Sequence, residues 1–399
     1  MRVLFLSNLF PDSDRPAFGL HNAGLIRRLA RHHAVSVVAP RPGLRAFLSR
    51  PGRAAAMPCD EDRGLSARFP AVPYVPRVGS LVNHRLYAAW LAPVLARECE
   101  ARRPEVVLAA WAYPDACAAL RLAVPAGLPC VVIAQGSDIN DYLDYPVRRR
   151  VILGHLARAS AVVTRSEALR ERLLAAGLPG TKVRTIYNGV DTELFHPALD
   201  REALRTELGL PTGDPVVLFV GNLVPVKNPL LAVEAVARLV QRPGAPCWRL
   251  LVVGDGAQRA AVQAAAAAAL GDAATLVGTC AQEAVSRYMQ AADVLCVPSR
   301  NEGVPNVIRE ALACGLPVVA TRVGGIPEVM SEPLCGELVD RDRPDAMAAA
   351  LDRVVRQGPW CEACRRHALN FSWDETVRRY DQVLAEVAGQ AVAEVIPLH

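Results

Sequence analysis

The segment 298–317 constrains the fold most tightly, because it contains a loop, a helix and a turn between two buried strands. Residues 293–297 form a short apolar run typical of a parallel strand, and 316–320 form another. Between them we expect a helix that starts with Pro305, whose fixed φ suits the first helical position. Gly315 is placed to end that helix as its C′ residue. This strand–loop–helix–strand order predicts an α/β domain built on a parallel sheet.

The start of this helix is a predicted anion site. A helix N-terminus presents N–H groups that have no intrahelical partner, together with the positive end of the helix dipole. Because Pro305 has no N–H, we expect the amides of Val304, Asn306 and Val307 to be the donors, beside Gly303. Phosphate is the usual occupant of such a site.

Two carboxylates flank the predicted anion site. Glu302 lies in the loop before the helix, and Glu310 lies more than one turn inside a helix of mostly apolar residues. A carboxylate on an apolar face needs a partner, and sugar hydroxyls would serve. The alternative is that Glu310 faces solvent and Glu302 only closes a loop, and these two residues alone leave it open.

The string E-G-V-P-N-V-I-R-E-A-L-A-C-G-L-P-V-V-A-T, residues 302–321, is followed by G-G-I-P-E, residues 324–328. Together they resemble the donor-binding signature of family-4 glycosyltransferases. Members of that family have the GT-B fold, an α/β fold of two Rossmann-like domains facing an interdomain cleft, and are retaining enzymes that use nucleotide-diphospho-sugars. The resemblance implies that Glu310 holds the ribose hydroxyls, that Glu302 lies near the transferred sugar, and that the helix N-terminus takes the diphosphate.

A second loop matches the family in part. The strand 216–220 leads into Gly221-Asn-Leu-Val-Pro-Val-Lys227, where family members usually read Gly-Arg-Leu-x-x-x-Lys-Gly. Asn222 replaces the arginine, which removes a charge and a bidentate grip, so the resemblance leaves Lys227 as the main cation for the diphosphate. The alternative is an exposed lysine at a helix start, where a cation is disfavoured unless it meets an anion. By resemblance the chemistry needs neither a metal ion nor a cofactor.

Three positions in the N-terminal half are expected to face the sugar or the acceptor, again by resemblance. Gly19 falls where the family backbone approaches the sugar phosphate, although the family often has two glycines there and a plain βα turn is the alternative. Gln135 stands where family members usually have histidine; it cannot act as an acid or base, but it can bond to a hydroxyl. Asp138 matches the family pattern and is expected to hold sugar or acceptor hydroxyls.

Length and composition agree with two domains of ordinary size. The chain has 399 residues, 52% of them hydrophobic. We expect a first domain at 1–192 that is completed by a helix at about 372–399, and a second at 193–371. Residues 41–80, rich in Pro, Gly and Arg, are expected to form irregular surface loops that select the acceptor.

The location is predicted to be cytoplasmic, because the first strand turns polar at once and no apolar run approaches the roughly 20 residues that span a bilayer. The 11 cysteines are accordingly expected to be reduced. Arg148, Arg149 and Arg150, with His155 and Arg158 beyond them, form either a basic face that docks on the inner membrane surface or a solvated helix face. No nucleic-acid partner is expected.

The sequence therefore predicts a retaining glycosyltransferase that moves a hexose-type sugar from a nucleotide-diphospho-sugar to a hydroxyl. The acceptor is expected to be a glycan or lipid-linked intermediate in bacterial polysaccharide or glycolipid synthesis, with Glu302 and Lys227 as catalytic residues. A glycosidase also uses paired carboxylates, but it has no need of a phosphate-binding helix. A nucleotide-sugar epimerase of the same fold and a binding-only subunit remain alternatives, the latter because Gln135 and Asn222 depart from the family pattern.

Overall fold

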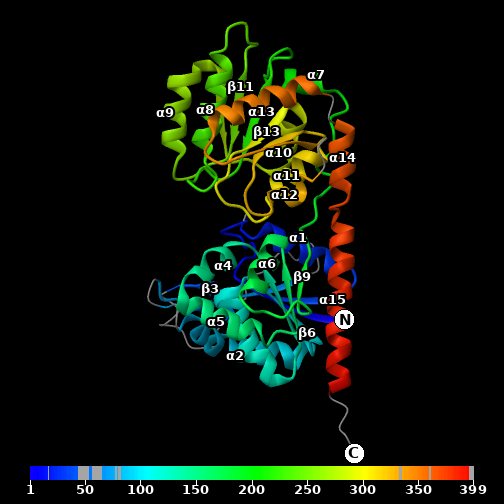
Figure 1. The fold of residues 1–399 in the computed structure, drawn as a ribbon. Coiled ribbons are helices and arrows are strands. Elements are labelled where there is room, and N and C mark those ends of the chain that lie inside the picture. Colours follow the sequence, from blue (N-terminus) through cyan, green and yellow to red (C-terminus); the bar gives the residue numbers. More distant parts are fainter. Residues whose placement is uncertain are drawn as a thin grey trace, which may run out of the picture. The chain divides into compact units, whose positions relative to one another are not determined.

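The structure, a computed structural model, describes residues 1–16, 18–43, 54–55, 65–76, 79, 82–331, 335–358 and 361–394 (Figure 1). The chain forms two compact units, one of Met1–Asn188 with Trp373–His399 and one of Gly189–Ser372. The sequence placed these boundaries at 192 and 371. Each unit has a mainly parallel sheet with helices on both faces, so the predicted pair of Rossmann-like α/β domains is confirmed.

The first unit contains a nine-stranded sheet in the order β3-β5-β2-β1-β6-β7-β8-β9, with β4 paired to β5. Its central strands are rich in apolar residues, many of them β-branched, as expected of strands that helices cover on both faces. The pairs along this order are parallel, so their carboxyl ends meet at one edge. The strands are β1 (Arg2–Leu6), β2 (Ala34–Val38), β3 (Arg41–Pro42), β4 (Ala54–Ala55), β5 (Ser66–Val72), β6 (Val106–Ala110), β7 (Cys130–Ala134), β8 (Ala161–Thr164) and β9 (Val183–Thr185).

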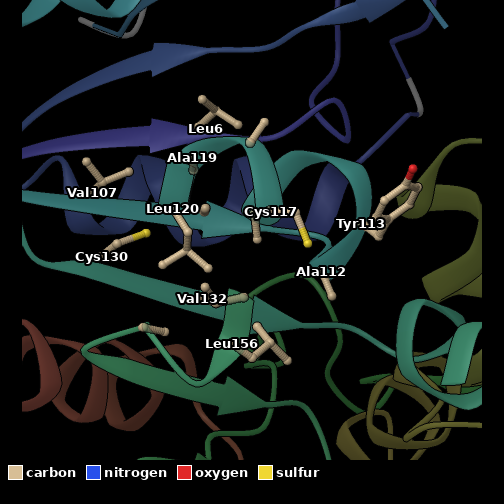
Figure 2. Close-up of a cluster of buried hydrophobic side chains, with 14 of the residues drawn as sticks. Leu6, Val107, Ala112, Tyr113, Cys117, Ala119, Leu120, Cys130, Val132 and Leu156 are labelled. Carbon is tan, nitrogen blue, oxygen red and sulfur yellow. The ribbon is translucent and has the colours of Figure 1, made fainter. Parts of the chain in front are cut away.

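Two buried clusters hold the helices to the two faces of this sheet. One cluster includes residues of α2, α3 and α5, and Figure 2 shows Cys117 and Leu120 of α3 against the strands that carry Val107, Cys130 and Val132. The other includes residues of α1 and α15. The helices are α1 (Leu20–Leu29), α2 (Asn83–Arg102), α3 (Cys117–Ala123), α4 (Ser137–Asn140), α5 (Pro146–Leu156), α6 (Glu167–Ala175) and α15 (Trp373–Glu394), with short turns η4 (Ala112–Ala116), η5 (Val124–Ala126) and η6 (Tyr142–Asp144).

The second unit has a six-stranded parallel sheet in the order β12-β11-β10-β13-β14-β15. Its strands are β10 (Val216–Val220), β11 (Arg249–Val253), β12 (Ala274–Gly278), β13 (Val294–Val297), β14 (Val318–Thr321) and β15 (Gly336–Val339). Its helices are α7 (Arg201–Glu207), α8 (Pro229–Val240), α9 (Arg259–Leu270), α10 (Gln282–Ala291), α11 (Asn306–Ala313), α12 (Ile326–Val329), α13 (Pro344–Gln357) and α14 (Cys361–Leu369), with η7 (Gly271–Ala273).

The strand–loop–helix–strand prediction is confirmed as β13, α11 and β14. Gly315 has φ +75 and follows the C-cap, as a C′ glycine should. Pro305 is the N-cap of α11 and not its first helical residue, because its ψ of 128° is extended. The helix therefore starts one position later than expected, and the amides of Asn306 and Val307 lie in its first turn.

One expectation about the first unit was wrong. Part of the segment 41–80 is the strand β5, which pairs in parallel with β2 and in the antiparallel direction with β4. Arg68 and Pro70 interrupt the apolar pattern of this strand. The structure accommodates both, since Arg68 pairs with the buried Glu98 of α2 and Pro70 lies opposite Ala54 near the sheet edge. Residues 44–53, 56–64, 77–78 and 80 of the expected loop lie outside the described residues.

Candidate active site

The loops after β10 and β13 flank a topological switch point. These strands are neighbours in the sheet, yet β10 leads to α8 on one face while β13 leads to α11 on the other. Ligands of open α/β sheets bind where the connections diverge in this way. The Arg300 amide donates to the Val226 carbonyl at 2.8 Å, so the two loops are directly joined.

Lys227 and Glu302 meet at this switch point. The Lys227 ammonium forms an ion pair with Glu302 Oε1, and the same oxygen accepts a hydrogen bond from Ser299 Oγ at 2.8 Å. The Glu302 side chain is 10% exposed and the Lys227 side chain 30%. The Thr321 hydroxyl in turn donates to the Ser299 carbonyl, which ties the Glu302 loop to β14.

This ion pair changes the sequence-based description of both residues. Lys227 was expected at the diphosphate and Glu302 at the sugar, as separate contacts. In the structure the anion that meets Lys227 is Glu302, which faces the ammonium and Ser299. An incoming diphosphate would compete with Glu302 for the same ammonium, since phosphate oxygens are strong charged acceptors.

Two glycines shape the backbone around Glu302. Gly324 has φ +51, and a Cβ there would lie 1.8 Å from the Glu302 carbonyl oxygen, so only glycine fits. The Gly325 amide donates to the Gly303 carbonyl at 2.8 Å. Close packing of the β14 loop on the Glu302 turn therefore explains the first glycine of the Gly-Gly pair in the sequence signature.

The loop of Gly221 is held in the same way. The Gly221 amide donates to the Val253 carbonyl, and a Cβ on Gly254 would lie 2.0 Å from the Gly221 carbonyl oxygen. Gly221 itself has φ +154, and a Cβ there would make only an ordinary contact with the Phe219 ring, at 3.9 Å. Asn222, which replaces the family arginine, is exposed.

Glu310 and the first turn of α11 supply the remaining donor-side groups. Glu310 is partly buried, and no described residue forms a hydrogen bond or ion pair with its carboxylate. Burial raises the pKa of Glu310 to about 7, although the Arg309 charge opposes the change. Asn306 accepts from the buried Arg309 guanidinium, which steadies the helix start next to Val304. A half-buried carboxylate without a protein partner favours a ligand-binding role.

In the first unit, Gly19 serves the packing of the loop after β1. It has φ +73, and a Cβ there would lie 2.4 Å from the Leu9 carbonyl carbon. Next to it, the buried Asn22 donates to the Leu9 carbonyl at 2.8 Å. This loop contact alone requires glycine at position 19, and an additional role at the sugar phosphate stays a prediction.

Gln135 is held by Asn22. Its Nε2 donates to Asn22 Oδ1 at 2.7 Å, and the orientation of Asn22 is set by its own bond to Leu9. This chain of amides leaves Gln135 Oε1 as a hydrogen-bond acceptor, suited to a hydroxyl donor. Sequence reasoning missed Asn22, although a buried asparagine on the apolar face of a helix is the kind of residue that needs such a partner.

Asp138 serves the backbone of its own loop in the structure, and its expected contact with sugar or acceptor hydroxyls stays a prediction. It is fully buried, and its carboxylate accepts the amides of Ala112 (2.7 Å), Gln135 (2.9 Å) and Gly136 (2.8 Å). Burial raises the pKa of Asp138, and the three amide bonds oppose that change. Asp138 therefore positions the loop that carries Gln135 and links it to the loop after β6.

Asp115 is a second buried acid that the sequence analysis missed. It follows β6, is fully buried, and accepts the Asn8 amide at 2.8 Å. Burial raises its pKa to about 7. Arg41 donates to the carbonyls of Asn8 and Phe10, so Asp115 and Arg41 together fix the first loop. The sequence did contain a signal for Asp115, because an acidic residue shortly after an apolar strand lies near the sheet edge where α/β proteins bind ligands.

The basic helix α5 carries an exposed edge. Tyr145 is 59% exposed and Val147 45% exposed, and the Arg148 guanidinium lies 4.5 Å from the centre of the Tyr142 ring. His155 does not belong to this surface, because it donates to Val151 and packs edge-on against the buried His84.

The described ranges contain neither a membrane span nor a metal centre. Among those residues no helix is long and apolar enough to cross a bilayer. Within the same ranges, no group of three or more His, Cys, Asp or Glu side chains is placed to hold a metal ion.

Comparison with known proteins identifies the class. Solved structures with the same fold include a sucrose-phosphate synthase from Thermosynechococcus elongatus, with a TM-score of 0.77, 21% identity and coverage of 98% of this chain and 99% of that one. Anabaena HepE in complex with UDP gives a TM-score of 0.76 at 21% identity, covering 97% of this chain and all of that one. The fold is thus that of the GT-B glycosyltransferases.

The family follows from the sequence matches. Residues 19–194 match the model of Glycosyltransferase Family 4, and residues 200–371 match that of Glycosyl transferases group 1. The chain belongs to the family-4 glycosyltransferases, as the sequence signature predicted. A curated relative, the D-inositol 3-phosphate glycosyltransferase of Salinispora arenicola, is 38% identical over 54% of this chain and 51% of its own length. The chain spans about half the length of the curated relatives that it matches.

Proposed function

We propose that this protein is a retaining glycosyltransferase that transfers a hexose from a nucleotide-diphospho-sugar to a hydroxyl acceptor. The observation that carries the proposal is the switch point of the second unit, where Lys227, Glu302 and the first turn of α11 come together. Two sets of groups in this site match the parts of a nucleotide sugar. The cation and the helix amides suit a diphosphate, and the carboxylates suit hydroxyl groups. A uridine nucleotide is the donor to test first, since HepE structures carry UDP and UDP-glucose.

In the proposed reaction the diphosphate takes Lys227 and the amides of Asn306 and Val307. Glu302, released from Lys227, turns to the sugar, while Glu310 holds the ribose hydroxyls. The bond between the anomeric carbon and the diphosphate oxygen breaks, and the acceptor oxygen bonds to that carbon on the same face. The departing diphosphate oxygen takes the acceptor proton, and configuration is retained because the acceptor attacks the face that the diphosphate leaves. Lys227 and the helix dipole stabilise the negative charge on the leaving group without a metal ion.

The acceptor is proposed to be a glycan or lipid-linked intermediate of bacterial polysaccharide or glycolipid synthesis. The name of the curated relatives, D-inositol 3-phosphate glycosyltransferase, adds a polyol phosphate as a second class to test. Gln135 Oε1 is proposed to accept a hydrogen bond from a sugar or acceptor hydroxyl. This role needs no imidazole, which fits the replacement of the family histidine.

Product analysis tests the proposal. The protein is incubated in EDTA with a panel of UDP-sugars, with and without inositol 3-phosphate and lipid-linked glycans, and the products are identified by mass spectrometry and proton NMR. We expect a glycosylated acceptor with the anomeric configuration of the donor. An epimerised nucleotide sugar formed without acceptor would identify an epimerase. Free sugar would identify a hydrolase, and donor binding without turnover on any acceptor a binding-only subunit.

We further propose that the exposed edge of α5 contacts anionic lipid. Tyr145 and Val147 are exposed next to Arg149 and Arg150, a mixture of aromatic, apolar and basic groups suited to a headgroup surface. Sedimentation with vesicles containing phosphatidylglycerol, compared with pure phosphatidylcholine, should show binding that Arg149→Glu/Arg150→Glu abolishes. Equal binding to both vesicles would remove this part of the proposal.

A further inference from the structure

Arg165 lies at the carboxyl edge of the first unit, beside Gln135. The register of β7 and β8 pairs Ala134 with Thr164, so Gln135 and Arg165 occupy the next positions of neighbouring strands. Ile133 and Val163, two residues earlier in each strand, belong to the same buried cluster. Because side chains alternate along a strand, Gln135 and Arg165 lie on that same face of the sheet.

The Arg165 guanidinium lacks an anionic partner among the described residues. The residue is 4% exposed, and its two terminal nitrogens are buried without a hydrogen bond. No described residue forms an ion pair with it; the guanidinium carbon lies 5.5 Å from the centre of the Tyr380 ring of α15. The Tyr380 hydroxyl is buried near the guanidinium and favours its charge, but the two groups do not have the geometry of a hydrogen bond.

Leaving these donors unsatisfied is unfavourable, because a buried donor loses its bonds to water and gains none from the protein in return. Asp138 is the buried carboxylate whose charge favours that of Arg165, but its oxygens already accept three backbone amides. Burial lowers the pKa of Arg165, with Tyr380 and Asp138 opposing, and a guanidinium remains charged at neutral pH. The fold thus retains a buried cation at the sheet edge where α/β proteins bind ligands.

Arginine in this position is suited to a planar or tetrahedral oxyanion, which its donors grip in pairs. Gln135, which is partly exposed, presents Oε1 to a hydroxyl beside it. The two side chains therefore offer a cation and a hydrogen-bond acceptor to one ligand. That combination fits a hydroxylated phosphate better than a neutral sugar.

We propose that Arg165 and Gln135 form a phosphate-binding subsite of the first unit, in which the guanidinium exchanges its contact with the Tyr380 ring for the oxygens of a substrate phosphate. The inference deepens the proposed transferase function and rests on it for the identity of the substrate. The phosphate comes either from the donor diphosphate or from a phosphorylated acceptor. These two sources share the same chemistry and are separated by experiment.

The first measurement needs no turnover. In the full chain carrying Lys227→Ala, which removes the cation of the second unit, melting is followed with inorganic phosphate and with chloride at equal ionic strength. We expect phosphate to raise Tm and Arg165→Met to abolish that rise. Arg165→Lys keeps the positive charge but loses the bidentate geometry of the guanidinium. It should weaken phosphate binding by about tenfold, the effect of losing one charge-assisted hydrogen bond.

The second measurement assigns the source, with Lys227 intact. If Arg165→Lys weakens UDP binding about tenfold, the subsite holds the donor diphosphate. The alternative result is that UDP binding and inositol binding are unchanged while inositol 3-phosphate binds about tenfold more weakly. In that case the subsite holds an acceptor phosphate. Unchanged binding of all three ligands would overturn the inference, as would loss of folding in both Arg165 variants, which would make Arg165 a structural cation. Absence of transferase activity with intact phosphate binding would refute only the proposed function.

Discussion

Substitution of Gly324 by alanine should disable the site without involving any side chain that contacts a ligand. The new Cβ would lie 1.8 Å from the Glu302 carbonyl oxygen, whereas such contacts are essentially never below 3.0 Å. The Glu302 turn must therefore move by 1.2 Å or more, the difference between these two distances. A displacement of about 1 Å in a catalytic group can reduce the rate about 100-fold. We expect a loss of that size in kcat.

Gly209→Ala is the matched control. Gly209 has φ +67, similar to the +51 of Gly324, but a Cβ at position 209 would meet nothing within 4 Å. Only the backbone strain of a left-handed residue applies, roughly 1–2 kcal/mol, which corresponds to about 2–8 °C in Tm for a unit of this size. Circular-dichroism melting and initial-rate assays on both variants separate strain from displacement. Equal kcat for the two proteins would refute the packing argument.

Three further outcomes follow from individual side chains. Glu310→Gln should weaken donor binding by about 1.5–3 kcal/mol for each charged hydrogen bond to ribose that is lost. Because the pKa of Glu310 is about 7, donor affinity of the unmodified chain should rise from pH 6 to pH 8. Calorimetry should show no such rise in the variant. Ser299→Ala removes the hydrogen bond that holds Glu302 and should lower kcat about tenfold without weakening UDP binding, since Glu302 competes with the diphosphate for Lys227. Weaker UDP binding with kcat unchanged would contradict this positioning role. Burial and the charge of His155 lower the pKa of His84 to about 4, so stability should fall as pH drops from about 6.5 towards 4, at up to about 1.4 kcal/mol per pH unit. His84→Phe should flatten that profile in thermal melts, and an unchanged slope would show that other groups cause it.

Local patterns predicted the donor-side helix and its carboxylates. The apolar runs, Pro305 and Gly315 bracket α11 to within one residue, because strand, cap and turn preferences act over a few positions. Family resemblance then placed Glu310 and Lys227 at one ligand. The orientation of Asp138 was not predictable, because it depends on which backbone amides the folded loop turns inward.

Contacts between residues far apart in the chain could not be predicted from the sequence. Lys227 and Glu302 are separated by 75 positions, and Asn22 and Gln135 by 113, so their pairing depends on strand order. Arg165 follows an ordinary apolar strand, and nothing in its neighbourhood distinguishes it from a solvent-exposed arginine. Only the register with β7 and its position under Tyr380 show that it is a buried cation.

The most direct test of the account is UDP binding in the presence of EDTA, measured by thermal shift. At 100 times its dissociation constant UDP should stabilise the chain by roughly 2.7 kcal/mol, with the shift greatly reduced in Lys227→Ala and retained in Asn222→Ala. That result would support a diphosphate site made of a lysine and helix amides. A shift that appears only after Mg²⁺ or Mn²⁺ is added, or one that survives Lys227→Ala unchanged, would contradict it.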